Sequence, residues 1–340
     1  MAAAMWVMPA SVPALPSVPS MPISVPASPA SSLSALQARL AAVARDSPAR
    51  VGVAAIDIVT GQMISVNGAE RFPMASTVKV AIAAAFLRDV ELGRLSLDRA
   101  YALPASERRL ARRVGDMRYR PGSLSGAELI DLMLTRSDNT AADILLGAIG
   151  GTQALDAWLT RVGVTGQRVD RSIAQLLSDR QTFKRMRVGR GRHRHWIEVA
   201  VPRSAPAGDK RDSSTPEAMV ALLAKLRGGE LLDRKRTDYL FEVMTRCRTG
   251  LNRIRGLLPS SVVVAHKTGT MNGVTDDVGV IGLPNGHPLA VAIFETGRGG
   301  VGAHDRSIAR LARLLYDGFA AVPAVAASAE RAAGDRGAGQ

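Results

Sequence analysis

The sequence predicts a mixed fold, α/β plus all-α, in which an antiparallel sheet built from both ends of the chain is flanked by terminal helices and carries an inserted helical domain. Segments typical of β-strands occur at residues 51–66 and again at 261–296. The segments between them have helical periodicity and capping signals. An amphipathic segment lies just outside the strands at each end of this pattern.

The composition excludes several classes of protein. With 340 residues, 46% hydrophobic and 22% charged, the chain is too long for a disulfide-stabilised mini-protein and too apolar for a disordered one. Aromatic residues make up only 4%, so the core must consist mainly of Ala, Val, Leu and Ile. The single cysteine, Cys247, excludes an intrachain disulfide and a cysteine-based zinc site. We expect neither a metal ion nor another cofactor.

The first part of the predicted sheet domain covers residues 33–75. It follows a Pro/Ser-rich leader, residues 1–32, which lacks the basic start and the unbroken apolar run of a secretory signal. This leader is interpreted either as a signal that has lost those features or as a flexible segment. Apolar residues at helical spacing predict a helix over Leu33–Arg45, and strands follow at Val51–Ile58 and Gln62–Val66.

The helical domain is expected over residues 76–249. Ala-rich periodicity, glycines that end helices, a capping box and an N-cap followed by proline mark its helices. They are expected at Ser76–Leu92, Ser125–Leu134, Thr140–Ile149, Thr152–Val162 and Thr215–Leu226.

Residues 250–319 form the second part of the predicted sheet domain. The dipeptide Asn285-Gly286 is typical of a hairpin turn between two strands. The Ala/Gly-rich tail, residues 320–340, is expected to be disordered. The strands and the final helix are expected at Ser261–Lys267, Asp277–Leu283, Pro288–Thr296 and Ala303–Phe319.

Positive charge is concentrated in an insertion within the helical domain. The net charge is +14, and residues 180–211 hold ten Lys and Arg against two acidic residues. Such a segment is either a solvated arginine-rich loop or a flap that binds acidic polymers. Because it has too few aromatic residues for a nucleic-acid platform, we expect no nucleic-acid partner. No apolar run approaches the roughly 18 residues that a membrane span needs.

Three short motifs carry chemistry, and the first two lie in the helical domain. Ser76 and Lys79 are one turn apart at a predicted helix start, where N–H groups and the helix dipole favour a developing oxyanion. A lysine enclosed by Ala and Val can have its pKa lowered enough to accept the serine proton. In a loop between predicted helices, Ser137 can relay a proton and Asn139 can hold an amide carbonyl.

The third motif is Lys267-Thr268-Gly269, at the end of a predicted strand. Lys267 supplies positive charge, and Thr268 with Gly269 leaves a slim strand edge that a substrate backbone can approach. Each motif alone is weak, because an isolated Ser76 is simply a helix cap. Three motifs in this order, each in a suitable element, are hard to obtain by accident.

From about Leu33 to Phe319 the sequence resembles the class A β-lactamases and the wider penicillin-recognising serine hydrolases. The likeness lies in the three motifs with their contexts, Phe72–Lys79, Leu134–Ala142 and His266–Thr270. It implies the β-lactamase/transpeptidase-like fold, an acyl-serine mechanism and a periplasmic or secreted location.

The resemblance implies the roles of the catalytic residues. Ser76 is the nucleophile, Lys79 its activator and Ser137 the proton shuttle. Lys267 supplies the positive charge for a substrate carboxylate. The oxyanion hole consists of the backbone N–H groups of Ser76 and Thr270.

It also implies a set of substrate-binding residues. Thr268 and Thr270 bind the carboxylate, Gly269 keeps the strand edge slim, and Asn139 holds the substrate amide. Arg253 matches an arginine that helps to bind the carboxylate in some members; the alternative is that it is only a surface charge.

One loop departs from the family pattern, which usually reads Arg-x-Asp-Arg-x-Glu-x-x-Leu-Asn. The Glu of that pattern activates the water that releases the acyl group. Asp170 and Arg171 fit, but Ile173 stands in place of the Glu and Leu177 in place of the Asn. Isoleucine cannot accept a proton, so we expect impaired or atypical deacylation. We also expect Arg171 to pair with Asp212 and close the loop around the basic insertion.

The basic insertion offers three substitute bases, His193, His195 and Glu198. The two histidines would share a face if their segment were a strand. We expect no zinc there, because no third ligand is spaced to join them.

The favoured interpretation is a monomeric β-lactamase-like serine hydrolase that is acylated by β-lactams and hydrolyses them with impaired deacylation. One alternative is a penicillin-binding, D,D-peptidase-like or esterase-like hydrolase of peptidoglycan-like substrates. Another is a catalytically retired scaffold that binds anionic polymers through the basic loop. The intact acylation motifs argue against retirement, and Ile173 argues against an ordinary lactamase.

Overall fold

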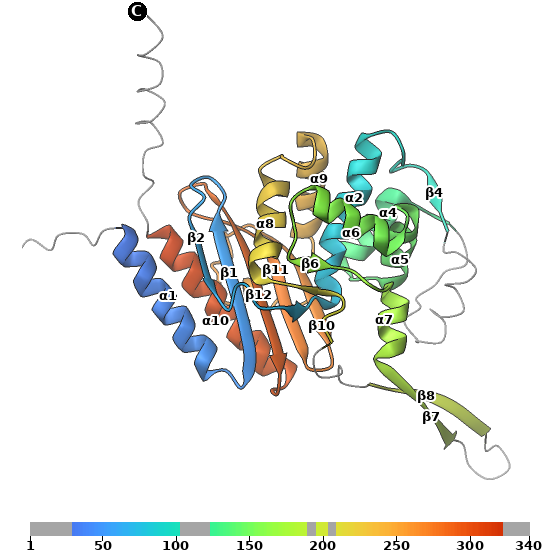
Figure 1. Ribbon diagram of the computed structural model, residues 1–340. Helices are drawn as coiled ribbons and strands as arrows, with labels where there is room; N and C mark the ends of the chain where they lie inside the picture. Colours follow the sequence, from blue (N-terminus) through green and yellow to red (C-terminus); the bar gives the residue numbers. More distant parts are fainter. Residues whose placement is uncertain (1–28, 103–122, 189–194, 203–208, 322–340) are drawn as a thin grey trace, which may run out of the picture.

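A five-stranded antiparallel sheet, in the order β10-β11-β12-β1-β2, joins the two ends of the chain (Figure 1). The computed structural model describes residues 29–102, 123–188, 195–202 and 209–321. Strand β1 pairs with β12 along its whole length, which confirms the predicted sheet. The strands are β1 (Ala49–Asp57), β2 (Met63–Val66), β10 (Val264–Met271), β11 (Val274–Gly282) and β12 (Pro288–Gly297).

Helices α1 (Pro29–Asp46) and α10 (Val301–Ala320) cover one face of this sheet (Figure 1). Alternate strand residues such as Val53 and Ile293 pack there against Leu40 of α1. Helix α1 begins four residues before the expected start, because apolar periodicity signals only the part that contacts the sheet. The predicted leader and tail otherwise lie outside the described residues.

The other face of the sheet packs against the helical part of the chain (Figure 1). The Ala-rich helix α2 is at its centre, with nine consecutive residues buried from Lys79 to Leu87. The predicted capping box of Ser125 with Glu128 is present, as is the Thr215 N-cap. The helices are α2 (Lys79–Glu91), α4 (Gly126–Thr135), α5 (Asn139–Ala148), α6 (Gly151–Arg161), α7 (Ile173–Asp179), α8 (Pro216–Arg227) and α9 (Arg234–Thr245).

Short elements connect these layers. Two 3₁₀ turns, η1 (Ala75–Val78) and η3 (Ile254–Leu257), lie where the chain passes between the sheet and the helices. The short strands form a three-stranded sheet in the order β3-β9-β6 and the pair β4-β5. They are β3 (Phe72–Pro73), β4 (Ala100–Tyr101), β5 (Leu124–Ser125), β6 (Gln167–Arg168) and β9 (Ser213–Ser214).

The continuous helix expected over Ser76–Leu92 is wrong in its first turn. Residues 75–78 form η1, and α2 begins only at Lys79. The cause is a tight bend: Ala75 has a φ of 43°, in the left-handed region, and the Thr77 hydroxyl donates to the carbonyl of Met74 at 2.7 Å. Ser76 therefore lies in the turn that leads into α2.

The basic insertion contains a β-hairpin, so the expectation of a loop is wrong. Strands β7 (Gln181–Val188) and β8 (His195–Pro202) pair from Gln181↔Pro202 to Val188↔His195 and extend away from the body of the molecule (Figure 1). The sequence of β8 is rich in residues with high β-propensity, which explains the strand. The candidate base His193 lies outside the described residues.

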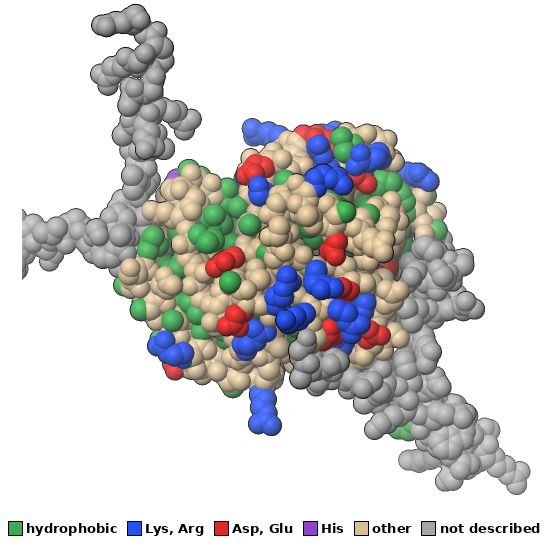
Figure 2. All heavy atoms as spheres, viewed as in Figure 1, with side chains coloured by type: hydrophobic (Ala, Val, Ile, Leu, Met, Phe, Trp, Pro, Cys, Tyr) green, Lys and Arg blue, Asp and Glu red, His purple; other side chains and the backbone are tan. Residues whose placement is uncertain are grey.

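Figure 2 shows basic side chains, with acidic ones among them, gathered around β6 near the start of this hairpin. Exposed residues of the adjoining segments include Arg71, Arg168, Lys210 and Arg211. Within the described ranges, no helix is long and apolar enough to cross a membrane.

Candidate active site

The three motifs meet at the hydroxyl of Ser137. Lys79 Nζ donates to Ser137 Oγ at 3.2 Å, and Lys267 Nζ donates to the same oxygen at 2.9 Å. Both lysine side chains are completely buried, whereas Ser76, one turn before Lys79, is partly exposed. The partly exposed Ser76 thus lies one turn before the first of two enclosed lysines that share one hydroxyl group.

Lys79 is fixed by three oxygen atoms. Besides Ser137 Oγ, its ammonium group donates to the carbonyl of Ser137 at 2.8 Å and to Oδ1 of Asn139. Ser137 has a φ of 59°, and this left-handed conformation lets its carbonyl and its hydroxyl both face Lys79. Because Oδ1 of Asn139 accepts from Lys79, the amide NH₂ is the end of that side chain suited to a substrate carbonyl.

Lys267 lies in the middle of a strand, not at the end of one as expected. Strand β10 runs to Met271 because Thr268, Gly269 and Thr270 pair with β11. Burial lowers the pKa of Lys267 to about 8, so most of the group is protonated at pH 7. Its ammonium group also donates to the carbonyl of Thr268 at 2.8 Å.

Gly269 allows the turn that carries Ser76, η1, to lie directly against β10. A Cβ atom at this position would be 2.8 Å from the carbonyl oxygen of Met74 and 3.1 Å from Cβ of Ala75. Any larger residue would force β10 away from η1. The strand edge must be slim at Gly269, as predicted, because η1, the turn that carries Ser76, lies so close to it.

Arg253 is buried under β10, with only 4% of its surface exposed, so the interpretation as a surface charge is wrong. Nη1 donates to the carbonyl oxygens of Gly269 and Asp276, each at 2.9 Å, and Nε donates to Asp305 at 2.8 Å. Nη2 donates to the hydroxyl of Thr270 at 2.9 Å. Every guanidinium nitrogen has an internal partner, and one of those partners is a predicted substrate ligand.

A second hydroxyl pair holds Thr268. Thr249 Oγ1 and Thr268 Oγ1 are 2.5 Å apart, and the buried thiol of Cys247 is 3.4 Å from Thr249 Oγ1. Sequence reasoning missed Thr249, because nothing in its local sequence signals that the turn after α9 folds against β10.

Ile173 is part of the apolar core. Its side chain is 6% exposed and belongs to the hydrophobic cluster between the sheet and the helices. It is the first residue of α7, where Asp143 accepts the backbone N–H groups of Ile173 at 2.7 Å and Ala174 at 2.9 Å. Sequence reasoning missed Asp143; the signal available was an acid within the apolar helix α5.

The predicted pair of Arg171 and Asp212 is confirmed. Arg171 Nε donates to Asp212 Oδ2 at 2.6 Å, and Asp212 Oδ1 accepts the backbone N–H groups of Asp170 and Arg171. Arg171 also donates to Asp179 at 2.7 Å. These bonds close the base of the segment that carries α7 and the hairpin.

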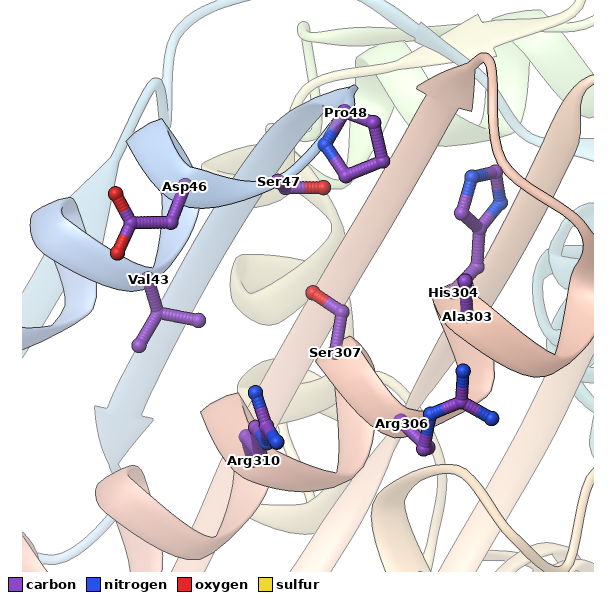
Figure 3. Close-up of a pocket in the computed structure, with 9 residues that line it drawn as sticks. All are labelled: Val43, Asp46, Ser47, Pro48, Ala303, His304, Arg306, Ser307 and Arg310. Atoms are coloured by element: carbon purple, nitrogen blue, oxygen red, sulfur yellow. The ribbon is translucent and has the colours of Figure 1, made fainter.

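A separate pocket lies on the other side of the sheet (Figure 3). It has a volume of about 260 Å³ and is lined by α1 and α10, including Asp46, His304, Ser307 and Arg310. None of the motif residues lines it. Among the side chains that the structure describes, no three His, Cys, Asp or Glu come together as metal ligands would.

Known proteins are similar to this chain in sequence and in fold. Residues 35–319 match the model of the beta-lactamase enzyme family. Beta-lactamase AST-1 from Nocardia asteroides is 32% identical over 259 residues, which cover 76% of this chain and 75% of that protein. Beta-lactamase VEB-1 from Pseudomonas aeruginosa is 28% identical over 266 residues, which cover 75% and 80%.

Solved structures of beta-lactamases are also similar to this chain. An ancestral class A beta-lactamase has a TM-score of 0.69 and 34% identity, with 84% of this chain and 100% of that chain covered. A beta-lactamase from Xanthomonas campestris has a TM-score of 0.70 and 29% identity, with 85% and 98% covered.

Proposed function

Because this chain belongs to the beta-lactamase enzyme family, we propose that it is a serine hydrolase that opens β-lactam rings through an acyl-enzyme on Ser76. The observation that carries the proposal is the Ser137 hydroxyl held between Lys79 and Lys267 beside the turn of Ser76. This arrangement gives a nucleophile, a base and a proton path in one enclosed site.

Acylation begins with proton transfer from Ser76. A lysine ammonium group has three N–H donors, and Lys79 forms three hydrogen bonds, two to Ser137 and one to Asn139. The neutral amine has only two N–H donors and a lone pair, and this lone pair can accept the Ser76 proton. Ser76 Oγ then attacks the lactam carbonyl carbon and the ring C–N bond breaks. The Ser137 hydroxyl delivers a proton to the leaving nitrogen and is reprotonated by a neighbouring lysine.

The substrate carboxylate binds at β10. The Lys267 ammonium group provides the charge, and the hydroxyls of Thr268 and Thr270 provide hydrogen bonds. Thr249 and Arg253 act as positioning residues, because they hold those two hydroxyls from behind the strand.

Deacylation is slow in this proposal. Hydrolysis of the ester needs a base that activates water, and the position that supplies it in the family pattern is occupied here by the buried Ile173. The acyl-enzyme therefore accumulates. We assign the protein to the periplasm or the exterior of the cell, as the family resemblance implies.

A D,D-peptidase-like role is the second candidate, and Ile173 is the observation that favours it. Penicillin-recognising peptidases and lactamases share acylation and differ in how readily the acyl group leaves. A peptidase would transfer or hydrolyse a D-Ala-D-Ala peptide, whereas a lactamase would turn over penicillin only.

The test of the proposed function is to map the site of acylation. After incubation with benzylpenicillin, peptide mapping should find one penicilloyl group on Ser76, and Ser76→Ala should carry none. Lys225→Ala, at a half-buried site on α8 where the lysine pairs with Glu230, is the matched control and should be acylated like the wild type. Absence of both adduct and turnover in a folded wild-type protein would contradict the proposal.

A further inference from the structure

The pocket between α1 and α10 takes no part in the proposed acylation, because it lies on the other side of the sheet from Ser76 (Figure 3). Its volume is about 260 Å³. A cavity of about 150 Å³ is enough to hold a benzene molecule. The pocket is therefore large enough for a small organic ligand.

Two arginines of α10 line this pocket without an ion-pair partner. Arg306 and Arg310 are one helical turn apart, so they lie on the same face of the helix. Both are exposed, and neither forms an ion pair or a hydrogen bond with another residue that the structure describes. Arg313 of the same helix, by contrast, pairs with Asp317 at 2.8 Å. Guanidinium groups match the geometry of carboxylate and phosphate oxygens, so this pair of arginines favours an oxyanion.

The hydroxyl of Ser307 is an independent sign of a ligand. Its Oγ is buried and has no hydrogen-bond partner among the described residues. Figure 3 shows Ser307 between Arg306 and Arg310, with Oγ directed toward Ser47 at the end of α1. Because a buried hydroxyl without a partner costs free energy, such groups are rare in folded proteins. An oxyanion held by the two arginines would accept this hydrogen bond.

The remaining wall of the pocket suits an apolar group. Val43, Pro48 and Ala303 contribute carbon atoms to it. His304 also lines the pocket, but both of its ring nitrogens are already engaged within the protein, at 3.1 and 3.0 Å. The polar contacts for a ligand are thus concentrated on the side of Arg306, Ser307 and Arg310.

Two acidic side chains lie near this site and determine the conditions of the test. The carboxylate of Asp46 is exposed and points away from Ser307 (Figure 3). Glu295 is completely buried on β12, next to Thr275, whose hydroxyl contacts His304. Burial raises the pKa of Glu295 to about 7. Below that pH its carboxyl is mainly protonated and uncharged, so it does not repel an anion.

We propose that this pocket binds a small organic anion, in which a carboxylate or a phosphate monoester is attached to a compact apolar body. Arg306, Arg310 and the hydroxyl of Ser307 bind the charged group, and the apolar wall contacts the body. No residue of the acylation site takes part, so this inference is independent of the proposed function.

Isothermal titration calorimetry of the full-length protein at pH 6, with benzoate and phenyl phosphate as probes, tests the site. Each should bind once per chain. Benzamide, which lacks the charge, and inorganic phosphate, which lacks the apolar body, should bind at least about tenfold more weakly. Arg310→Gln should weaken benzoate binding about tenfold or more, whereas Arg313→Gln, the matched control on the same helix, should bind like the wild type. Absence of binding, equal binding by Arg310→Gln, or inorganic phosphate binding as tightly as phenyl phosphate would overturn the proposal.

Ser307→Ala separates a ligand-binding hydroxyl from one that serves the structure. Removing a buried hydroxyl without a partner should raise the melting temperature of the unliganded protein by about 2 °C or more. The same change should weaken benzoate binding about tenfold, because a hydrogen bond to the charged group is lost. A lower melting temperature together with unchanged benzoate binding would show that the hydroxyl is bonded within the protein, and would contradict its assignment to the ligand.

Discussion

At the scale of single residues, the proposed slow deacylation rests on Ile173, which stands where the family pattern has its base and whose side chain belongs to the apolar core. The backbone there is nevertheless held firmly by Asp143. The backbone of any side chain placed at this position is therefore fixed. The surrounding side chains are apolar, however, and disfavour a charged group.

Ile173→Glu should speed the decay of the penicilloyl-enzyme. General-base help is worth on the order of 10²–10⁴ in rate, and burial beside Asp143 limits the gain to about the low end of that range. Ile173→Gln is the matched control, with the same shape and no base. Decay of the adduct after removal of free penicillin is the measurement, and equal rates for Glu and Gln would contradict the assignment of this position.

Lys267 should give acylation a dependence on pH. Its pKa is lowered to about 8 by burial, so the ammonium charge is present below pH 8 and is lost as the pH rises through that value. Attraction of the substrate carboxylate disappears over the same range, and the acylation rate should fall several-fold between about pH 7 and 9.

The methyl ester of the same penicillin separates this effect from titration of other groups. It carries no carboxylate, so the ratio of acid to ester acylation rates should fall as the pH passes 8. A ratio that is constant with pH would show that Lys267 does not bind the carboxylate through its charge.

At the scale of elements, the segment from Arg171 to Asp212 is closed by a buried ion pair. Arg171 and Asp212 are 7% and 9% exposed, and backbone N–H groups satisfy the remaining carboxylate oxygen. Removing one partner of such a pair leaves the other buried and unpaired.

Arg171→Met should lower the free energy of unfolding by about 3–5 kcal/mol, as measured by urea denaturation. Arg234→Met is the control, since Arg234 is 95% exposed and its pair with Asp238 should be worth less than about 0.5 kcal/mol. A cost for Arg171→Met as small as that of the control would mean that the pair does not close the segment.

The elements also show what could be predicted from sequence. Strong periodicity and caps identified α2, α4, α8 and the strand pair around Asn285-Gly286, because those signals are local. Helix α9 was missed since its first turn, Arg234–Asp238, is charged, and its apolar stripe becomes clear only against the core. Strand β10 was predicted to stop at Lys267, because pairing with β11 is a tertiary effect.

The residues of the candidate site also divide into those that local sequence patterns predict and those that only the folded chain brings together. The motif residues could be placed because each depends on a short local pattern. Arg253 was singled out only through the family resemblance and Thr249 was missed, because both act through contacts between distant segments. Asp143 was missed although an acid within an apolar helix was an available signal. The close approach of η1 to β10, which Gly269 permits, is likewise a property of the folded chain.

At the scale of the whole molecule, the body that holds the site is separate from the hairpin that extends from it (Figure 1). The sheet joins both chain ends, and the helices pack on either face of it.

Replacing residues 182–201 by two glycines should leave folding and acylation nearly unchanged. Gln181 and Pro202 are paired across the hairpin, so a short link can join them. Thermal unfolding and the rate of penicillin acylation are the measurements, with a scrambled hairpin of equal length and charge as the control. Loss of acylation in a folded deletion variant would show that the hairpin helps to build the site.

The central claim is that Ser76 is acylated faster than it is deacylated, and time-resolved intact-mass measurement after mixing with benzylpenicillin tests it most directly. The account predicts that a single penicilloyl adduct forms, becomes the main species and decays slowly once free penicillin is consumed. Rapid turnover of penicillin with no detectable adduct would contradict it, because another group would then supply the base that Ile173 cannot.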